Sequence, residues 1–347
     1  MKATYKQHNL QFKRPSGTSR GVLHTKESWF LILRDNNKIG IGECGLLRGL
    51  SIDDKPDYEQ KLQWLCKNIQ RDKGELLQEL RHYPSIQFGL EMALQSLKAE
   101  NPMQLFPSAF TEGKAKIPIN GLIWMGEKSF MKEQIEEKIE QGFHCIKLKI
   151  GAIDFEKEVE LLQYIRKEFS AKAIELRVDA NGAFHPDQAL EKLKRLSELD
   201  LHSIEQPIKQ DQAEEMARLC QETPLPIALD EELIGIVNKT EKEQLLTQIK
   251  PQYIILKPSL VGGFAASDEW INAAEKHKIG WWITSALESN IGLNAIAQFT
   301  YQKDTNLPQG LGTGSLYTNN ITAPLEVKKE FLTYNPQKNW DLQSIIN

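Results

Sequence analysis

From about residue 116 onward, short apolar segments alternate with longer amphipathic ones along the chain. The apolar segments have the length of strands, and the stretches between them carry polar faces at helical spacing, as in residues 154–162. Such alternation predicts parallel strands joined by right-handed helical crossovers. The strands are expected at about 116–123, 145–150, 174–180, 202–206, 226–231, 253–258, 280–286 and 309–313. Eight parallel strands favour a closed (β/α)8-type barrel, an α/β fold, over an open sheet, which more often has fewer strands.

The first 115 residues or so lack this alternation and indicate a small α+β domain. Strands are expected near the N-terminus, at 28–34 and at 39–43, and helices at 56–72 and 84–99. Two polar, glycine-containing stretches, 14–21 and 45–51, interrupt these elements. We interpret both as loops, and the first as a mobile one.

The alternation is lost again after residue 313, although residues 325–328 have a strand-like pattern. The chain is therefore divided into an α+β domain at 1–115, a barrel domain at 116–313 and a C-terminal segment at 314–347. The C-terminal segment is expected to return to the first domain.

Composition limits the kinds of partner. The net charge of −4 and the pI near 6.1 indicate no broad basic surface for nucleic acid or an anionic membrane. The N-terminus has no apolar signal core, and no run approaches the roughly 20 apolar residues of a membrane span. The four cysteines are scattered, which is typical of reduced core thiols. A cytoplasmic protein with a small-molecule partner is expected, and its oligomeric state is left open.

Charged residues recur near the carboxyl ends of successive predicted strands. From Lys149 on, they are 25 to 30 residues apart, which is the length of one strand, one helix and two short loops. In a (β/α)8-type barrel these strand ends surround one mouth, where catalytic groups lie. The residues are Lys147 and Lys149 on the second strand, Asp179 on the third, Glu205 on the fourth, Asp230 on the fifth and Lys257 on the sixth.

Three carboxylates at one mouth raise one another's pKa unless a cation balances them. A hard divalent ion is the usual solution, and an all-oxygen ligand set points to Mg2+, with Mn2+ as a substitute. A lysine beside such an ion has a lowered pKa and can remove a proton, while the metal stabilises the anion that forms. The chemistry that this arrangement suits is removal of a proton α to a substrate carboxylate.

Taken singly, each of these residues has a simpler structural interpretation. The lysine pair could lie on a solvated strand edge, Asp179 could belong to a turn, and Lys257 could form a salt bridge at the rim of the barrel. These interpretations do not predict charged residues at the same end of five successive strands. The joint pattern therefore favours an active site.

With these residues in place, the chain resembles the muconate-lactonizing-enzyme subgroup of the enolase superfamily, over nearly its whole length. The motifs that carry the resemblance are Lys147-Leu-Lys149, Asp179, Glu205-Gln-Pro207, Asp230-Glu231 and Lys257-Pro-Ser259. Lysine or histidine bases acting with Mg2+ are the known solution of this superfamily. The resemblance implies a modified TIM barrel with an N-terminal α+β capping domain.

Within the subgroup, the segments at 177–183, 285–292 and 309–314 are most similar to the o-succinylbenzoate synthase family, the dehydratases of menaquinone biosynthesis. Dipeptide epimerases of the subgroup usually carry Asp-x-Asp at the eighth strand, where this chain has Leu311-Gly-Thr313. N-Acylamino acid racemases share the lysine pair, so racemisation of N-succinylamino acids stays open as an alternative.

The resemblance implies a role for each residue. Lys149 would take the α-proton and then protonate the departing hydroxyl on the same face, Lys147 would assist electrostatically, and Lys257 would stabilise the enediolate from the other face. Asp179, Glu205 and Asp230 would ligate Mg2+, with Asn181 and Glu231 around them. Thr18, Arg20, Ser285, Gly310, Gly312 and Thr313 would contact the substrate carboxylate or its succinyl tail.

Arg177 precedes Asp179 by two residues and so points to the same side of its strand, where it could position Lys149 or balance the carboxylates. The glycines at 310 and 312 could donate backbone N–H groups to a carboxylate, or could form a tight corner of the barrel. Two further hypotheses remain from the residues alone. Lys257 could be the nucleophile of a Schiff-base lyase, or the chain could be a metal-dependent binding protein.

Overall fold

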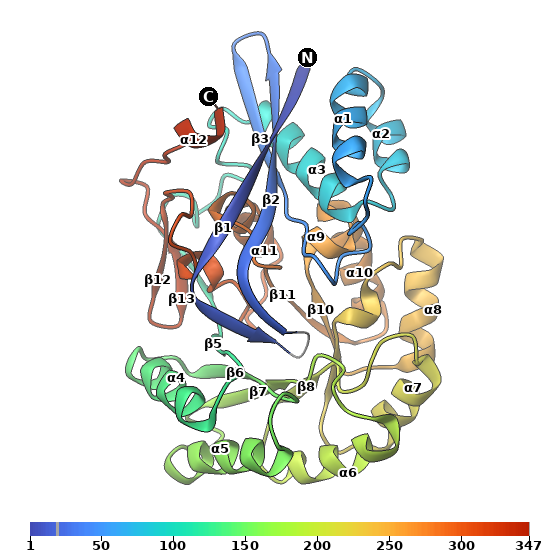
Figure 1. Ribbon diagram of the computed structural model, residues 1–347, viewed down its shortest axis with the longest axis vertical. Coiled ribbons are helices and arrows are strands. Elements are labelled where there is room, and N and C mark those ends of the chain that lie inside the picture. The colour runs from blue at the N-terminus through green and yellow to red at the C-terminus, as the bar shows by residue number, and fades with distance from the viewer. Residues whose placement is uncertain (19–20, 347) are drawn as a thin grey trace.

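The computed structural model describes residues 1–18 and 21–346 of the chain (Figure 1). The first domain begins with an antiparallel sheet of order β1-β2-β3, and three helices pack on one side of it. Its elements are β1 (Lys2–Thr18), β2 (Gly21–Asp35), β3 (Lys38–Cys44), α1 (Tyr58–Asn68), α2 (Lys73–Glu79) and α3 (Pro84–Lys98). Gly40 and Gly42 on β3 face α3 so closely that a Cβ at either position would collide with the backbone of that helix.

The prediction of a loop at 14–21 was wrong for most of that stretch. Residues up to Thr18 continue β1, and Ser16, Gly17 and Thr18 pair with the beginning of β2. A break in register between Gln11 and Ser16 accommodates Pro15, which has no N–H to donate to the ladder. Gly17 also bridges to Met125, so this end of the β1–β2 ribbon lies against the barrel (Figure 1).

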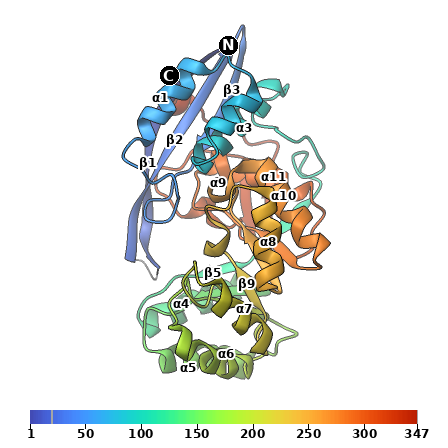
Figure 2. The same cartoon turned by 90° about the vertical axis from the view of Figure 1, so that its right-hand side faces the viewer.

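The barrel consists of a curled parallel sheet of seven strands, in the order β11-β10-β9-β8-β7-β6-β5. The strands are β5 (Gly121–Ile123), β6 (Cys145–Lys149), β7 (Glu175–Asp179), β8 (Ser203–Glu205), β9 (Ile227–Leu229), β10 (Tyr253–Leu256) and β11 (Gly280–Ile283). The helices on its outside are α4 (Lys128–Glu140), α5 (Phe155–Glu168), α6 (Pro186–Ser197), α7 (Ala213–Glu222), α8 (Lys239–Ile249), α9 (Pro258–Val261), α10 (Gly263–Lys276) and α11 (Asn290–Tyr301) (Figure 2). The expected fold class, an enolase-like barrel behind an N-terminal α+β domain, is confirmed.

Two predicted strands differ from the structure. The eighth, at 309–313, is reduced to two bridging residues, because Gln309 pairs with Ile119 and Gly310 with Thr284. These bridges join β11 to the segment that precedes β5. The glycine-rich stretch therefore closes the barrel wall with two bridges and without a longer ladder of strand hydrogen bonds. The first predicted strand, at 116–123, is split into β4 (Lys116–Pro118) and β5, and β4 turns away to pair with the C-terminal hairpin.

The C-terminal segment contacts both parts of the molecule. Its hairpin, β12 (Leu325–Lys328) and β13 (Phe331–Tyr334), forms a three-stranded antiparallel sheet with β4. Residues 316–319 run beside β1, and Arg34 of β2 donates to the carbonyl of Ile346 in α12 (Gln343–Ile346) over 2.8 Å. Within the two described ranges, no helix has both the length and the apolar character required to cross a bilayer.

Candidate active site

The predicted catalytic residues meet at the carboxyl ends of the parallel strands. In the strand register, Lys149 on β6 lies opposite Asp179 on β7, which in turn lies opposite Glu205 on β8. Asp230 directly follows β9, and Lys257 directly follows β10. Parallel strands in register bring side chains of equal height to the same side of the sheet, so the spacing seen in the sequence becomes one cluster of charges.

Each carboxylate of the cluster is held by a lysine ammonium. Lys147 Nζ lies 2.9 Å from Asp179 Oδ2 and also contacts Glu205 Oε2. Lys149 Nζ donates to Asp179 Oδ2 over 2.9 Å, and Lys257 Nζ donates to Asp230 Oδ2. Three ammonium groups therefore balance three almost fully buried carboxylates.

The three carboxylates are not equally balanced. Burial opposes ionisation of Asp179, but Lys147, Lys149 and Lys257 outweigh this effect and lower its pKa. Burial and the charge of Asp179 raise the pKa of Glu205 to about 8, in spite of Lys147. Glu205 Oε1 is also buried without a hydrogen-bond partner in the described part of the chain. Glu205 is therefore the acid of this cluster that most lacks a compensating cation.

The donor set fits a hard divalent cation, although no three metal-ligand side chains in residues 1–18 and 21–346 are already arranged as ligands of one ion. The reason is visible in the contacts, because Lys147 bridges Asp179 and Glu205 while Lys257 binds Asp230. These ammonium groups occupy oxygens that a cation would need. The unpartnered Glu205 oxygen and the all-carboxylate donors suit Mg2+.

Asn181 connects Lys149 to the acidic residues around it. Its Oδ1 accepts from Lys149 Nζ over 2.7 Å, and its Nδ2 donates to Glu231 Oε1 over 3.0 Å. Its backbone N–H donates to Asp179 Oδ1 over 3.0 Å. The residue adopts a left-handed conformation, with φ 44°, which asparagine tolerates better than most residues. The predicted positions of Asn181 and Glu231 beside the charged cluster agree with these contacts.

Arg177 does not occupy its predicted place. Its guanidinium donates to Glu175 over 2.7 Å and to the Pro308 carbonyl over 3.0 Å, and it lies 4.4 Å from the centre of the Trp282 ring. Among the described contacts of Arg177, none reaches Lys149 or the three carboxylates. Arg177 lies opposite Lys147 in the strand register, but its guanidinium is directed to Glu175, Pro308 and Trp282 and not to the charged cluster.

A cavity of about 810 Å³ has part of this cluster in its lining, is partly covered by the first domain, and extends past β5 to α4 and the C-terminal hairpin. The three lysines, Asp179 and Asn181 line its floor, and Ser285, Gly312 and Thr313 lie on its wall. Residues 21–23 and 47–50 of the first domain cover it. The second predicted loop therefore reaches the site, whereas Arg20 and the side chain of Thr18 lie outside what the structure describes.

The glycine-rich segment is a corner of the barrel at Gly310. Its N–H donates to the Ile283 carbonyl over 2.9 Å, so this group is not available to a substrate carboxylate. A Cβ at this position would collide with the side chain of Thr284. Beside it, Ser285 Oγ and Thr313 Oγ1 are 2.6 Å apart and form a polar edge of the cavity. Of the two alternatives for these glycines, the structure favours the tight corner at Gly310, whose N–H is already used, and both Gly310 and Gly312 line the cavity.

Sequence analysis missed several residues of the cavity wall. Asn120, between β4 and β5, and Trp124, just after β5, line it, as does Leu287. For Asn120 and Trp124, the signal in the sequence was the interruption of the strand pattern around Asn120-Gly121. Leu287, with a φ of 65°, lies in the segment 285–292 that carries the family resemblance, but it was given no role.

Glu158 on α5 supports the loop that follows the lysine-bearing strand β6. Its carboxylate accepts from the Gly151 N–H over 2.6 Å, and burial raises its pKa to about 7 in spite of the backbone donors. The pKa of Glu158 is thus about 7 in the folded chain and near 4.5 in the unfolded chain. Its contribution to stability is therefore fully present below pH 4.5 and is lost as the pH rises through about 7.

We therefore expect Glu158→Gln to unfold with the same free energy as the unmodified chain near pH 4.5, and to be more stable by on the order of 2–3 kcal/mol at pH 8. Urea unfolding across this pH range measures the difference. Glu168→Gln, at an exposed position of the same helix, is the control and should show no such trend. A difference that does not change with pH would contradict the argument.

Two family models cover most of the chain. Residues 130–336 match the enolase C-terminal domain-like family, and residues 7–97 match the MenC N-terminal domain. These matches, on the barrel and its cluster of lysines and carboxylates, define the class: an enzyme of the enolase superfamily, whose members are typically metal-dependent.

More particularly, the chain belongs to the o-succinylbenzoate synthase family. It is 48% identical to the o-succinylbenzoate synthase of Desulfotalea psychrophila, over 94% of this chain and 97% of that protein. The crystal structure of MenC from the same organism superimposes with a TM-score of 0.86 at 44% identity, over 96% and 99% of the two chains. The L-Ala-D/L-Glu epimerase of Bacillus subtilis, at 19% identity and a TM-score of 0.83 over 96% of each chain, shares the fold.

Proposed function

We propose that this enzyme dehydrates 2-succinyl-6-hydroxy-2,4-cyclohexadiene-1-carboxylate to 2-succinylbenzoate, a step of menaquinone biosynthesis. It is then a carbon–oxygen lyase. One observation carries the proposal: in a member of this family, Lys149 and Lys257 line a single cavity together with an acidic cluster suited to a divalent cation. The activity of the 48% identical relative, an o-succinylbenzoate synthase, agrees with it.

Lys149 is proposed as both base and acid. Its neutral amine removes the proton α to the carboxylate, and the C–H electron pair forms an enediolate whose charge lies on the carboxylate oxygens; the pair enters the ring when the C–O bond breaks. The resulting ammonium then protonates the departing hydroxyl on the same face, so the C–O bond breaks, water leaves and the ring becomes aromatic. Asn181 and Asp179 accept hydrogen bonds from Lys149 Nζ and so hold it in place between these steps.

Lys257 is proposed to act as a cation. Burial alone lowers its pKa, but Asp230, Glu205 and Glu231 outweigh this effect and raise it. A lysine that is held protonated stabilises negative charge on the substrate better than it removes a proton. Lys147 has a raised pKa as well, because Asp179 and Glu205 outweigh its burial, and it is proposed to balance these carboxylates.

Asp179, Glu205 and Asp230 are proposed to hold Mg2+, for which Mn2+ can substitute. When bound, the ion offsets the second negative charge that develops on the substrate carboxylate oxygens.

Removal of divalent metal is expected to lower the dehydration rate by at least about 100-fold, since a Lewis acid contributes several kcal/mol to such a step. The measurement is loss of the cyclohexadiene substrate, with and without EDTA. Addition of Mg2+ or Mn2+ in excess of the chelator should restore the rate. Full turnover in EDTA would contradict the metal site, and no turnover with Mg2+ would contradict the dehydratase.

Racemisation of N-succinylamino acids is the alternative that the site also admits, because Lys149 and Lys257 both line the cavity and could serve as two bases. Exchange of the Cα proton for deuterium in D2O, measured separately with each enantiomer, tests it. The proposed partner is in either case a small-molecule carboxylate. With a net charge of −4, neither nucleic acid nor a membrane is proposed, and the proposed location is the cytoplasm.

A further inference from the structure

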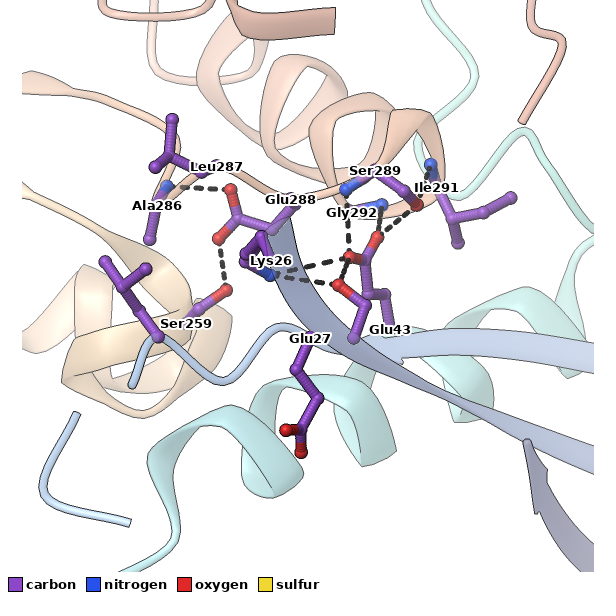
Figure 3. A network of polar contacts seen from close by, with 12 residues as sticks. Lys26, Glu27, Glu43, Ser259, Ala286, Leu287, Glu288, Ser289, Ile291 and Gly292 are labelled. Carbon is purple, nitrogen blue, oxygen red and sulfur yellow. Dashed lines mark hydrogen bonds and ion pairs between the residues drawn. The ribbon is translucent and has the colours of Figure 1, made fainter. Parts of the chain in front are cut away.

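A second buried cluster of charges lies where the first domain meets the barrel (Figure 3). Lys26 on β2 is 3% exposed, and Glu43 on β3 and Glu288, after β11, are both 0% exposed. None of these three residues lines the cavity or touches the catalytic lysines in the described contacts. A buried cluster of this kind is costly unless its charges are paired and hydrogen-bonded, so its position calls for an explanation.

Glu43 binds the first turn of a barrel helix. Its Oε2 accepts from Ser289 Oγ over 2.5 Å and from the Gly292 N–H over 2.9 Å, and its Oε1 accepts from the Ser289 N–H over 2.9 Å. These donors belong to the start of α11 (Figure 3). A carboxylate from the first domain thus satisfies N–H groups that the barrel helix leaves unpaired.

Glu288 holds the rim of the barrel. Its carboxylate accepts from the Ala286 N–H over 2.7 Å and from Ser259 Oγ, two residues after Lys257. Between Ala286 and Glu288, Leu287 has a φ of 65°, a left-handed conformation that is strained for a non-glycine residue. Ala286 and Leu287 both line the cavity. Glu288 therefore helps to keep a strained wall segment in place.

Lys26 is the basic residue in the described contacts of these two carboxylates. Its Nζ donates to Ser28 Oγ over 2.9 Å and lies 3.9 Å from Glu43 Oε1. It also lies beside Glu288, since a Cβ on Gly45 would be 3.5 Å from Lys26 Nζ and 3.0 Å from Glu288 Cγ. Two negative charges thus share one positive charge. Without Lys26, two carboxylates would remain buried with no cation, which favours outward movement or protonation of one of them.

The same cluster adjoins the loop that covers the cavity. Gly45 begins this loop, and a Cβ there would lie 3.0 Å from Glu288 Cγ and 3.1 Å from Ser259 Oγ. Residues 47–50 of the loop line the cavity from above. One charge cluster therefore fixes both the wall segment of the barrel and the start of the covering loop.

We propose that Lys26 is a positioning residue for the reaction: it balances Glu43 and Glu288 at the domain interface and so keeps the wall segment 285–289 and the covering loop in their substrate-binding arrangement. Lys26 touches no substrate, and its effect passes through Glu288. The activity measurement below rests on the proposed dehydratase function, whereas the exchange measurement does not.

The test compares three variants with the unmodified enzyme. Lys26→Met removes the cation and keeps the side-chain length, and we expect kcat/KM to fall about tenfold, mainly through a higher KM. Glu288→Gln added to Lys26→Met returns the cluster to its original net charge and keeps the acceptor oxygen for Ala286. This double variant is expected within about threefold of the unmodified enzyme, since contacting groups couple strongly. Lys13→Met, at an exposed position of β1, is the control and should change kcat/KM less than about twofold.

Hydrogen exchange gives the readout that does not depend on activity. The amides of Ala286, Ser289 and Gly292 should exchange faster in Lys26→Met and at the original rate in the double variant, because their acceptors are Glu288 and Glu43. Lys26→Met with unchanged kinetics and exchange would overturn the proposal, and so would a double variant no better than the single one. If Lys26→Met does not fold, the double variant decides alone. Inactivity of the unmodified enzyme, with the exchange pattern as expected, would refute the dehydratase function only.

Discussion

Lys149→Ala is expected to lower kcat for dehydration by at least about 1,000-fold. General acid–base catalysis by one positioned group contributes about 100- to 10,000-fold, and Lys149 is proposed to serve first as base and then as acid. Its ammonium lies 2.9 Å from Asp179 Oδ2 and 2.7 Å from Asn181 Oδ1, so the substitution removes the group that these acceptors hold. Single-turnover formation of the aromatic product, followed by absorbance, measures the loss.

Lys149→Arg separates proton transfer from charge balance. Arginine keeps a positive charge beside Asp179 but stays protonated, so it cannot act as a base. We expect this variant to be as inactive as Lys149→Ala, with a folded state of ordinary stability. Substantial turnover by Lys149→Arg would show that the lysine only balances Asp179, and the proposed mechanism would have to be abandoned.

Lys257→Met is expected to lower kcat by about 100- to 1,000-fold, the usual cost of removing one charge-stabilising group from an active site. In the structure this ammonium binds Asp230 and lines the cavity that Lys149 also lines. If Lys257 acts as a cation, Lys257→Arg should recover activity to within about tenfold of the unmodified enzyme. Initial rates with saturating Mg2+ measure both variants.

The same pair of variants distinguishes dehydration from the two-base alternative. A racemase needs a lysine that releases and takes up a proton on each face, so arginine at position 257 would abolish exchange of one enantiomer's Cα proton in D2O. Lys257→Arg that is as inactive as Lys257→Met, together with enantiomer-specific loss of exchange, would favour racemisation over the cationic role.

The sequence was sufficient to place the acidic and basic residues on one rim. The spacing of 25 to 30 residues is the length of one βα unit. Because the parallel strands are in register, residues at this spacing lie at the same height in the barrel. For this reason Lys149, Asp179 and Glu205 meet in the structure as the pattern predicted. The alternation of apolar and amphipathic segments likewise predicted six of the parallel strands, β6 to β11, to within three residues of their ends.

The same reasoning was not sufficient where the direction of a buried side chain or tertiary pairing decides. Arg177 shares a strand face with Asp179 and lies opposite Lys147, yet its guanidinium is held by Glu175 and Trp282. The polar stretch at 14–18 became part of a strand because β2 supplied a pairing partner. The local sequence indicates neither where a buried side chain ends in a barrel nor which strand a segment will pair with.

By itself, then, the sequence determined the barrel, its catalytic rim and the class of chemistry, because these follow from periodicity and from the kinds of charge at the strand ends. Only the tertiary structure decided which lysine balances which carboxylate, and that Glu205 keeps an unpartnered oxygen. It also decided that Lys26, Glu43 and Glu288 meet across the domain interface. These three residues lie up to 262 positions apart in the chain, and only the docking of two separately folded surfaces brings their charges together.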